Sequence, residues 1–379
     1  MIGAAKCPRS LLCATVLVAF GAAAADAAPK TRPFYMGFSP FPYDVTTEAV
    51  EWTYDRVSEH GDLFAHHLDT GVPWPEASAG SSFPPLVANE LASRAIRTPA
   101  SHKIYLALTP LNQFRDGLAA YWSNEGPVQP PGAWARRAFD HPRVVKAYTA
   151  YCLRVIEELD PAYMAYGIEV DLLAKNDPAA FEDFKRLARK VYRRIKKRHP
   201  DLPLILTFTL GQPGEWEDKK RVMRPLLPFT DVLAISTYPF LAVGFDGKPS
   251  RIPDDWFSRI REIHPDKPIA VAETSYAAED VEFETLDVFI PGRKTWQKAY
   301  AKRLLRDADD LDMEFVVWLF VVDYDALWEI ALEMGASEIF RAWRDSGFYD
   351  DGLRERPALK QWNRYLKRGR VDASPNSGD

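Results

Sequence analysis

Eight short apolar segments recur along the chain, and a stretch with helical periodicity follows each of them. We expect these segments to be strands, over residues 34–39, 62–68, 103–108, 163–170, 203–209, 231–236, 268–272 and 315–320. Amphipathic helices are expected between them, among others over residues 47–59, 144–158, 178–198 and 295–309. Strands that alternate with helices predict a parallel sheet, and eight such units predict an α/β fold that closes as a (β/α)8 TIM barrel.

An open, doubly wound sheet is the structural alternative to this barrel. That fold usually carries a glycine-rich turn directly after its first strand. Here the first strand runs into Phe38-Ser39-Pro40-Phe41-Pro42, which contains no glycine. No Ser/Gly linker or low-complexity run interrupts residues 34–365, so the pattern favours a single barrel domain.

The first residues have the pattern of a targeting segment. Lys6 and Arg9 precede an apolar run over residues 11–20 that is too short to cross a bilayer, and Ala25-Asp26-Ala27 fits a small-x-small cleavage pattern. We therefore expect export to a periplasm or to the medium, with an uncleaved anchor as the alternative. The expected parts are a signal peptide, a catalytic domain and a disordered polar tail, over residues 1–28, 29–366 and 367–379.

The net charge and the cysteine content limit which partners and which covalent cross-links the chain can have. The formal net charge of −5 offers no basic surface for nucleic acid or for an anionic membrane, so we expect neither as a partner. Cys7 and Cys13 leave with the signal peptide, and Cys152 alone cannot form an internal disulfide. A mature chain of about 350 residues is long enough to be held together by its core alone.

In a barrel of this kind the chemistry lies where the strands end and the next loops begin. The residues predicted at those ends are acids, amides, hydroxyls and aromatic rings. This set suits a sugar, because sugar hydroxyls take hydrogen bonds and the apolar ring faces stack on Trp and Tyr. We therefore expect a carbohydrate substrate. With no phosphate-cradling glycine loop in view, we expect no cofactor.

The end of the second strand adds His66, His67 and Asp69, which could suggest a metal site. Neighbouring strand residues point to opposite faces, so only one of the two histidines can line the barrel. No second His or Cys cluster completes a ligand set, and we predict no metal. We assign His66 and Asp69 to substrate binding, with a satisfied core histidine as the alternative for His66.

Trp74 and Tyr276 are further candidates for substrate binding. Trp74 lies in a long loop over the predicted catalytic end, and other tryptophans fall in similar loops. Some of these rings could form loop cores, but their concentration favours an aromatic-lined groove. Tyr276 follows the seventh strand, and Asp171, after the fourth, is expected to cap a helix.

Two glutamates stand out as catalytic candidates. Glu169 lies in Tyr166-Gly-Ile-Glu-Val-Asp171 and Glu273 in Val271-Ala-Glu-Thr-Ser-Tyr276. Strands four and seven lie across the barrel from each other, so acids at their ends would face one another over the mouth. Glycoside hydrolysis needs such a pair, at about 5–5.5 Å for a retaining enzyme and about 6.5–9.5 Å for an inverting one. A buried, ion-paired structural acid is the alternative for Glu273.

These two glutamates, together with Ala234-Ile-Ser-Thr-Tyr-Pro-Phe240, resemble the motifs of clan A glycoside hydrolases. The pattern is most similar to that of the family 53 endo-β-1,4-galactanases, and residues 347–362 resemble the final turn and helix of such barrels. The resemblance implies that Glu273 is the nucleophile and Glu169 the acid/base. It also implies that Tyr238 orients the nucleophile and that Trp318 is a sugar platform.

Three other functions remain open. Clan A usually places Asn before the acid/base, where this chain has Ile168, and a glycan-binding barrel with weak or lost turnover is therefore an alternative. Gly167-Ile-Glu-Val-Asp171 also resembles family 18 chitinase-like barrels, but Leu173 stands where their catalytic Glu is expected. A non-glycosidic hydrolase is the third possibility, although the sequence has no nucleophile elbow or metal ligand set.

Overall fold

The computed structural model describes residues 31–242, 244–333 and 335–371, and the predicted signal peptide lies outside them. Parallel strands form a closed barrel in the spatial order β1-β2-β3-β6-β7-β8-β9-β12, with β12 pairing back to β1. The predicted TIM barrel is confirmed. Its strands are β1 Tyr35–Ser39, β2 Leu63–Leu68, β3 Lys103–Leu108, β6 Tyr163–Ala165, β7 Leu204–Thr209, β8 Val232–Thr237, β9 Ile269–Thr274 and β12 Phe315–Phe320.

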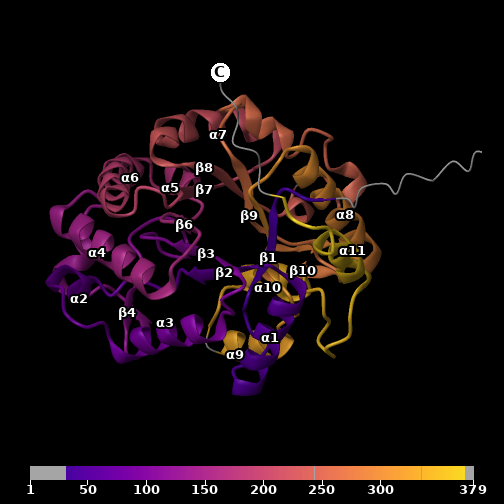
Figure 1. The fold of residues 1–379 in the computed structure, drawn as a ribbon, viewed down its shortest axis with the longest axis horizontal. Coiled ribbons are helices and arrows are strands. Elements are labelled where there is room, and N and C mark those ends of the chain that lie inside the picture. Colours follow the sequence, from indigo (N-terminus) through magenta and orange to yellow (C-terminus); the bar gives the residue numbers. More distant parts are fainter. Residues whose placement is uncertain (1–30, 243, 334, 372–379) are drawn as a thin grey trace, which may run out of the picture.

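Helices surround the barrel on all sides of the view in Figure 1. They are α1 Thr47–His60, α2 Trp74–Ala79, α3 Pro85–Arg97, α4 Pro142–Leu159, α5 Asp171–Asn176, α6 Pro178–Arg198, α7 Trp216–Met223, α8 Lys294–Asp310, α9 Asp325–Glu333, α10 Arg341–Arg344 and α11 Pro357–Leu366. Two hairpins interrupt the alternation, β4 Tyr121–Ser123 with β5 Gly126–Val128, and β10 Val281–Phe283 with β11 Val288–Ile290.

The connection between β8 and β9 departs from the predicted alternation. Its described residues form three short 3₁₀ turns, Pro239–Leu241, Pro249–Arg251 and Ser258–Glu262, where the pattern predicted an α-helix. Four prolines between residues 239 and 265 explain this departure, since proline removes an amide donor and clashes with the preceding turn of an α-helix.

Helix α6 illustrates how local sequence determines where a helix begins and ends. Pro178 occupies its first turn, and the Asp177 side chain accepts a hydrogen bond from the amide of Ala180 at 2.9 Å, which caps the helix. Three basic residues fill the last turn, where they interact favourably with the helix dipole. The helix thus has the bounds that its periodicity predicted.

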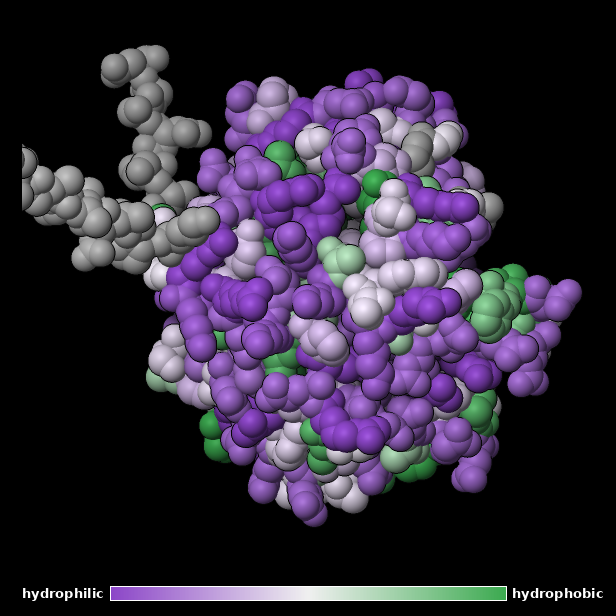
Figure 2. All heavy atoms as spheres, turned by 90° about the vertical axis from the view of Figure 1, so that its right-hand side faces the viewer, coloured by the Kyte–Doolittle hydropathy of each residue, from purple (hydrophilic) through white to green (hydrophobic). Residues whose placement is uncertain are grey.

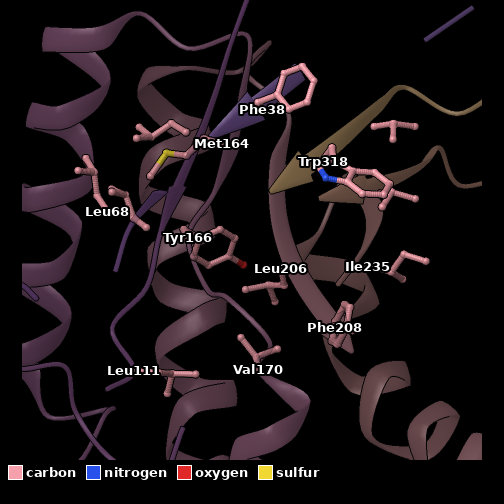
Figure 3. Close-up of a cluster of buried hydrophobic side chains, with 14 of the residues drawn as sticks. Phe38, Leu68, Leu111, Met164, Tyr166, Val170, Leu206, Phe208, Ile235 and Trp318 are labelled. Atoms are coloured by element: carbon pink, nitrogen blue, oxygen red, sulfur yellow. The ribbon is translucent and has the colours of Figure 1, made fainter. Parts of the chain in front are cut away.

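Most buried apolar residues belong to two clusters, one inside the barrel and one between the strands and the surrounding helices. The inner cluster includes Ala65, Tyr105 and Val317, and the outer cluster packs the strands against the helices. Figure 3 shows part of the outer cluster, to which Trp318 of β12 belongs. Successive residues of a regular strand alternate between these clusters. In β9 a register shift between the pairs Ile235–Val271 and Ser236–Glu273 interrupts this alternation just before Glu273.

The two ends of the described chain meet beneath the barrel. The amide of Arg32 donates to the carbonyl of Gly369 at 3.1 Å, and the amide of Val371 donates to the carbonyl of Arg32 at 3.0 Å. Residues 367–371 are therefore ordered, so the predicted start of a disordered tail at residue 367 is wrong for these residues. The rest of that tail, residues 372–379, lies outside the described residues.

Among the described residues, no helix combines the length and the apolarity needed to span a bilayer. The side of the molecule in Figure 2 is mostly hydrophilic, with hydrophobic residues scattered over it.

Candidate active site

Glu273 lies near the end of β9, at the mouth of the barrel. Its side chain is 14% exposed, and the hydroxyl of Tyr238 donates to its Oε1 at 3.1 Å. Burial, and after it the charge of Asp69, raise the pKa of Glu273, while Arg115 and the Tyr238 hydrogen bond act against this rise. Tyr238, whose ring is partly buried, thus contacts the carboxylate that it was predicted to orient.

Glu169 lies in a turn beyond β6, because this strand ends at Ala165 and not at residue 170 as predicted. The residue adopts a left-handed backbone with φ of 51°, and its amide donates to the Thr207 hydroxyl at 2.9 Å. Burial raises the pKa of Glu169 to about 7, and the charge of Glu273 is the next cause. The two glutamates are therefore close enough to interact, and their catalytic roles stay a prediction.

The histidine at this site is His67, and the assignment of His66 to substrate binding is wrong. His67 Nε2 lies 3.9 Å from Glu273 Oε2. His66 points to the helices, where its Nε2 hydrogen-bonds the Thr98 hydroxyl at 2.8 Å and its Nδ1 lies 3.3 Å from Arg94 Nη1. The sequence showed that only one of the pair could face inward, but it did not show which.

Arg115 and Asp69 complete the charges around the glutamates. Asp69 is 48% exposed at the end of β2, and Arg115 Nη2 lies 3.9 Å from its Oδ2. The same Nη2 lies 3.7 Å from Glu169 Oε2. Asp69 is therefore brought to the mouth, where its role in substrate binding stays a prediction. Arg115 was missed, because it follows the third strand in a turn without a recognisable motif.

Three aromatic residues that the sequence assigned to sugar binding are fully buried. Trp318, Tyr276 and Trp74 each have 0% exposed surface. Each donates its polar hydrogen to a backbone carbonyl, at 3.0, 2.7 and 2.9 Å respectively. No ring face is left for a sugar, so these assignments are wrong. All three rings pack in the outer cluster, which stabilises the barrel and its loops.

Trp343 is the aromatic residue that lies beside the candidate site. It belongs to the short helix α10, and its ring centroid is 5.2 Å from that of Tyr238, at an interplanar angle of 74°. The ring is partly exposed, and its buried Nε1 has no hydrogen-bond partner among the described residues. Its position after the eighth strand was the available signal, but no motif distinguished it from neighbouring aromatic residues.

Asp171 was predicted to cap a helix, but it binds a neighbouring strand. It is the first residue of α5, and its Oδ1 accepts from the amide of Thr209 at 2.8 Å. Its Oδ2 accepts from the Thr209 hydroxyl at 2.6 Å and pairs with Lys219. These contacts fix the turn that carries Glu169 against the end of β7.

One group of carboxylates could in principle hold a cation. Asp323, Asp325 and Asp345 have oxygen atoms within 4.8 Å of one another in the part of the chain that the structure describes. Arg356 pairs with Asp323 at 2.6 Å, and Arg344 pairs with Asp345 at 2.8 Å. The arginines already supply positive charge to this group, which we interpret as an ion-pair network.

Comparison with known proteins supports the fold. No protein-family model matches the chain, and no curated protein sequence matches it. The GH5_18 protein from Streptomyces cattleya, solved in complex with Manb1-4GlcNAc, is 14% identical; the match covers 90% of this chain and 86% of that one, with a TM-score of 0.61. Xylanase 10B from Thermotoga maritima is 11% identical, with coverage of 88% and 95% and a TM-score of 0.56.

A GH53 catalytic domain from Ignisphaera aggregans also matches, with 16% identity, coverage of 80% and 84%, and a TM-score of 0.48. At that TM-score the match does not bear on the choice of family. The GH5_18 and xylanase 10B structures, with TM-scores of 0.61 and 0.56, show that the chain shares their barrel fold, and the predicted resemblance is confirmed at the level of the fold.

Proposed function

We propose that the protein is an exported, retaining glycoside hydrolase that cleaves a β-linked poly- or oligosaccharide, with Glu273 as nucleophile and Glu169 as acid/base. One observation carries the proposal: Glu273 of β9 and Glu169 of the turn after β6 both lie at the mouth of the barrel, largely buried, and the charge of Glu273 raises the pKa of Glu169. Two such carboxyl groups hold a proton between them more readily than two isolated ones. Export is supported by the pattern of residues 1–28.

The first step forms a covalent intermediate. The ionised carboxylate of Glu273 attacks the anomeric carbon while the glycosidic C–O bond breaks, and the proton of Glu169 passes to the leaving oxygen. The raised pKa of Glu169 keeps that proton available near neutral pH. Tyr238 stabilises the ionised form of Glu273 through its hydrogen bond.

The second step releases the sugar. Glu169, now ionised, takes a proton from water, whose oxygen attacks the anomeric carbon as the ester bond to Glu273 breaks. Two inversions give net retention, and both glutamates return to their initial state. Trp343, beside Tyr238, is suited to stack on a sugar ring, while Asp69 and His67 are suited to accept or donate hydrogen bonds to hydroxyl groups.

The test combines a panel of plant and bacterial polysaccharides with a mechanism-based fluoro-sugar. We expect hydrolysis of at least one β-linked glycan and covalent labelling of the peptide that contains Glu273. Glu273→Ala should lower kcat/KM by about 10⁴-fold or more. Glu169→Ala should lower it by about 10²- to 10⁴-fold, with partial rescue by azide on activated substrates.

Glu182→Ala, on the exposed surface of α6, is the matched control and should leave the rate unchanged. Labelling of a different residue, or near-normal hydrolysis by Glu273→Ala, would show that the nucleophile is misassigned.

A glycan-binding barrel without turnover is the second candidate, and Ile168 favours it. This residue is buried in the inner cluster, where clan A enzymes usually carry an asparagine that hydrogen-bonds the sugar. An apolar side chain cannot supply a contact that strengthens in the transition state. Tight binding of a glycan that the protein never cleaves would favour this candidate.

A further inference from the structure

The loop after β3 holds one arginine at the mouth of the barrel. Leu111 and Leu118 pair as an antiparallel bridge, so the residues between them form a closed turn. Within it, Asn112 Nδ2 donates to Asp116 Oδ1 at 2.6 Å, and its Oδ1 accepts from the Asp116 amide at 3.2 Å. Arg115, in this turn, has a left-handed backbone with φ of 54°, which is unfavourable for a residue with a side chain. Such conformations persist only where the surrounding structure enforces them.

The turn is also anchored to the segment that carries Glu169. Asn176, the last residue of α5, donates through Nδ2 to the carbonyls of Phe114 and Arg115, at 2.9 and 3.3 Å. Helix α5 begins two residues after Glu169. The backbones of Arg115 and Glu169 are therefore fixed relative to each other.

The guanidinium of Arg115 is buried between two carboxylates. Its side chain is 8% exposed, and its Nη2 lies 3.7 Å from Glu169 Oε2 and 3.9 Å from Asp69 Oδ2. Nη1 donates to the carbonyl of Asn112 at 2.9 Å. A cation at such distances favours the ionised form of nearby carboxyl groups.

The other groups around Glu169 act mostly in the opposite direction. Three carboxyl groups raise the pKa of Glu169. A histidine and a tyrosine also interact electrostatically with it. These groups are Asp69 after β2, His67 on β2, Asp171 on α5, Tyr238 after β8 and Glu273 on β9. Burial lowers the pKa of His67, so this ring is neutral at neutral pH and supplies no compensating charge.

We propose that Arg115 is a positioning residue: its guanidinium holds the Glu169 carboxyl group against the mouth and sets the pH range in which the two glutamates work as acid and nucleophile. This inference rests on the proposed glycosidase function. Without the guanidinium, both carboxyl groups bind their protons more tightly. Glu273 then ionises only at higher pH, and Glu169 keeps its proton to higher pH, so both limbs of the pH profile move in the same direction.

The test compares the pH dependence of kcat/KM in Arg115→Gln, Arg115→Lys and the wild type. Arg115→Gln should move both limbs to higher pH by about one unit or more. Arg115→Lys keeps a positive charge and should move them less. Arg186→Gln, which removes an arginine from an exposed pair on α6, should leave both limbs in place. A purely structural role for Arg115 would lower the rate without moving the limbs, and that result would overturn the proposal.

A second measurement does not depend on turnover. NMR titration of ¹³C-labelled glutamates, assigned with Glu169→Gln and Glu273→Gln, should show higher midpoints for the remaining carboxyl groups when Arg115 is changed to Gln. Arg115→Met, which keeps the apolar stem, serves if the Gln variant does not fold. Unchanged midpoints would refute the inference. If the wild type cleaves no glycan but Arg115→Gln still raises the midpoints, the proposed function is refuted and the role of Arg115 stands.

Discussion

The outer and inner sides of the barrel differ in what their polar and aromatic residues do. On the outward face, His66 and Trp318 are fully buried and their polar atoms have protein partners. On the side of the mouth, Glu169 and Glu273 are partly exposed and interact mainly with other ionisable groups. A residue at a strand end is therefore not a site residue by position alone. The side of the barrel that its side chain faces decides between a structural role and a role at the site.

The largest expected effect contrasts two tryptophans. Trp318→Ala removes a fully buried ring and should lower the free energy of unfolding by about 3–5 kcal/mol, while the folded fraction keeps its activity. Trp343→Ala should have the reverse profile, with a small loss of stability and a large rise in KM, since its ring is partly exposed beside Tyr238. Denaturant unfolding and steady-state kinetics measure both. A stable, inactive Trp318→Ala variant would contradict the comparison.

The two adjacent histidines sharpen the same contrast. His66→Ala removes a fully buried ring and its hydrogen bonds with the Thr98 hydroxyl and Arg94, and should cost about 1–3 kcal/mol of stability. His67→Ala should instead lower kcat, because its ring lies next to Glu273. Thermal unfolding and kinetics on the two variants give the comparison directly. Equal losses of stability in both would mean that the two faces are not functionally distinct.

The smallest expected effect concerns Tyr238. Tyr238→Phe removes the hydrogen bond that stabilises ionised Glu273, so the pKa of Glu273 should rise and the acidic limb of the profile should move to higher pH. A hydrogen bond to a charged group contributes about 1.5 kcal/mol or more, which corresponds to about tenfold in rate on the acidic side. Stability should change little. An acidic limb that stays in place would show that the hydroxyl does not act on Glu273.

Sequence periodicity predicted the barrel and both glutamates, because buried parallel strands leave strong apolar runs and their carboxyl ends converge. It did not predict which face His66 or Trp318 occupies, since a shift of one residue reverses every side chain of a strand. The apolar run over residues 163–170 also could not show that the strand before Glu169 ends at Ala165.

Arg115 and Trp343 were missed for a different reason. Both lie in connections between strands and helices, a turn after β3 and the short helix α10. Their positions depend on tertiary contacts with α5 and with Tyr238. Local sequence carries no periodic signal for such contacts, so residues of this kind become visible only in three dimensions.

The pairing of Arg32 with residues 369–371 has a practical consequence for handling the protein. Both ends of the described chain lie at the face of the barrel where the strands begin, while Glu169 and Glu273 lie at the opposite face, where the strands end. A tether or fusion partner attached at either end would hang below the molecule, and an immobilised preparation could still present its working surface to an insoluble polymer. For the same reason, joining the two ends and reopening the chain elsewhere should preserve the barrel.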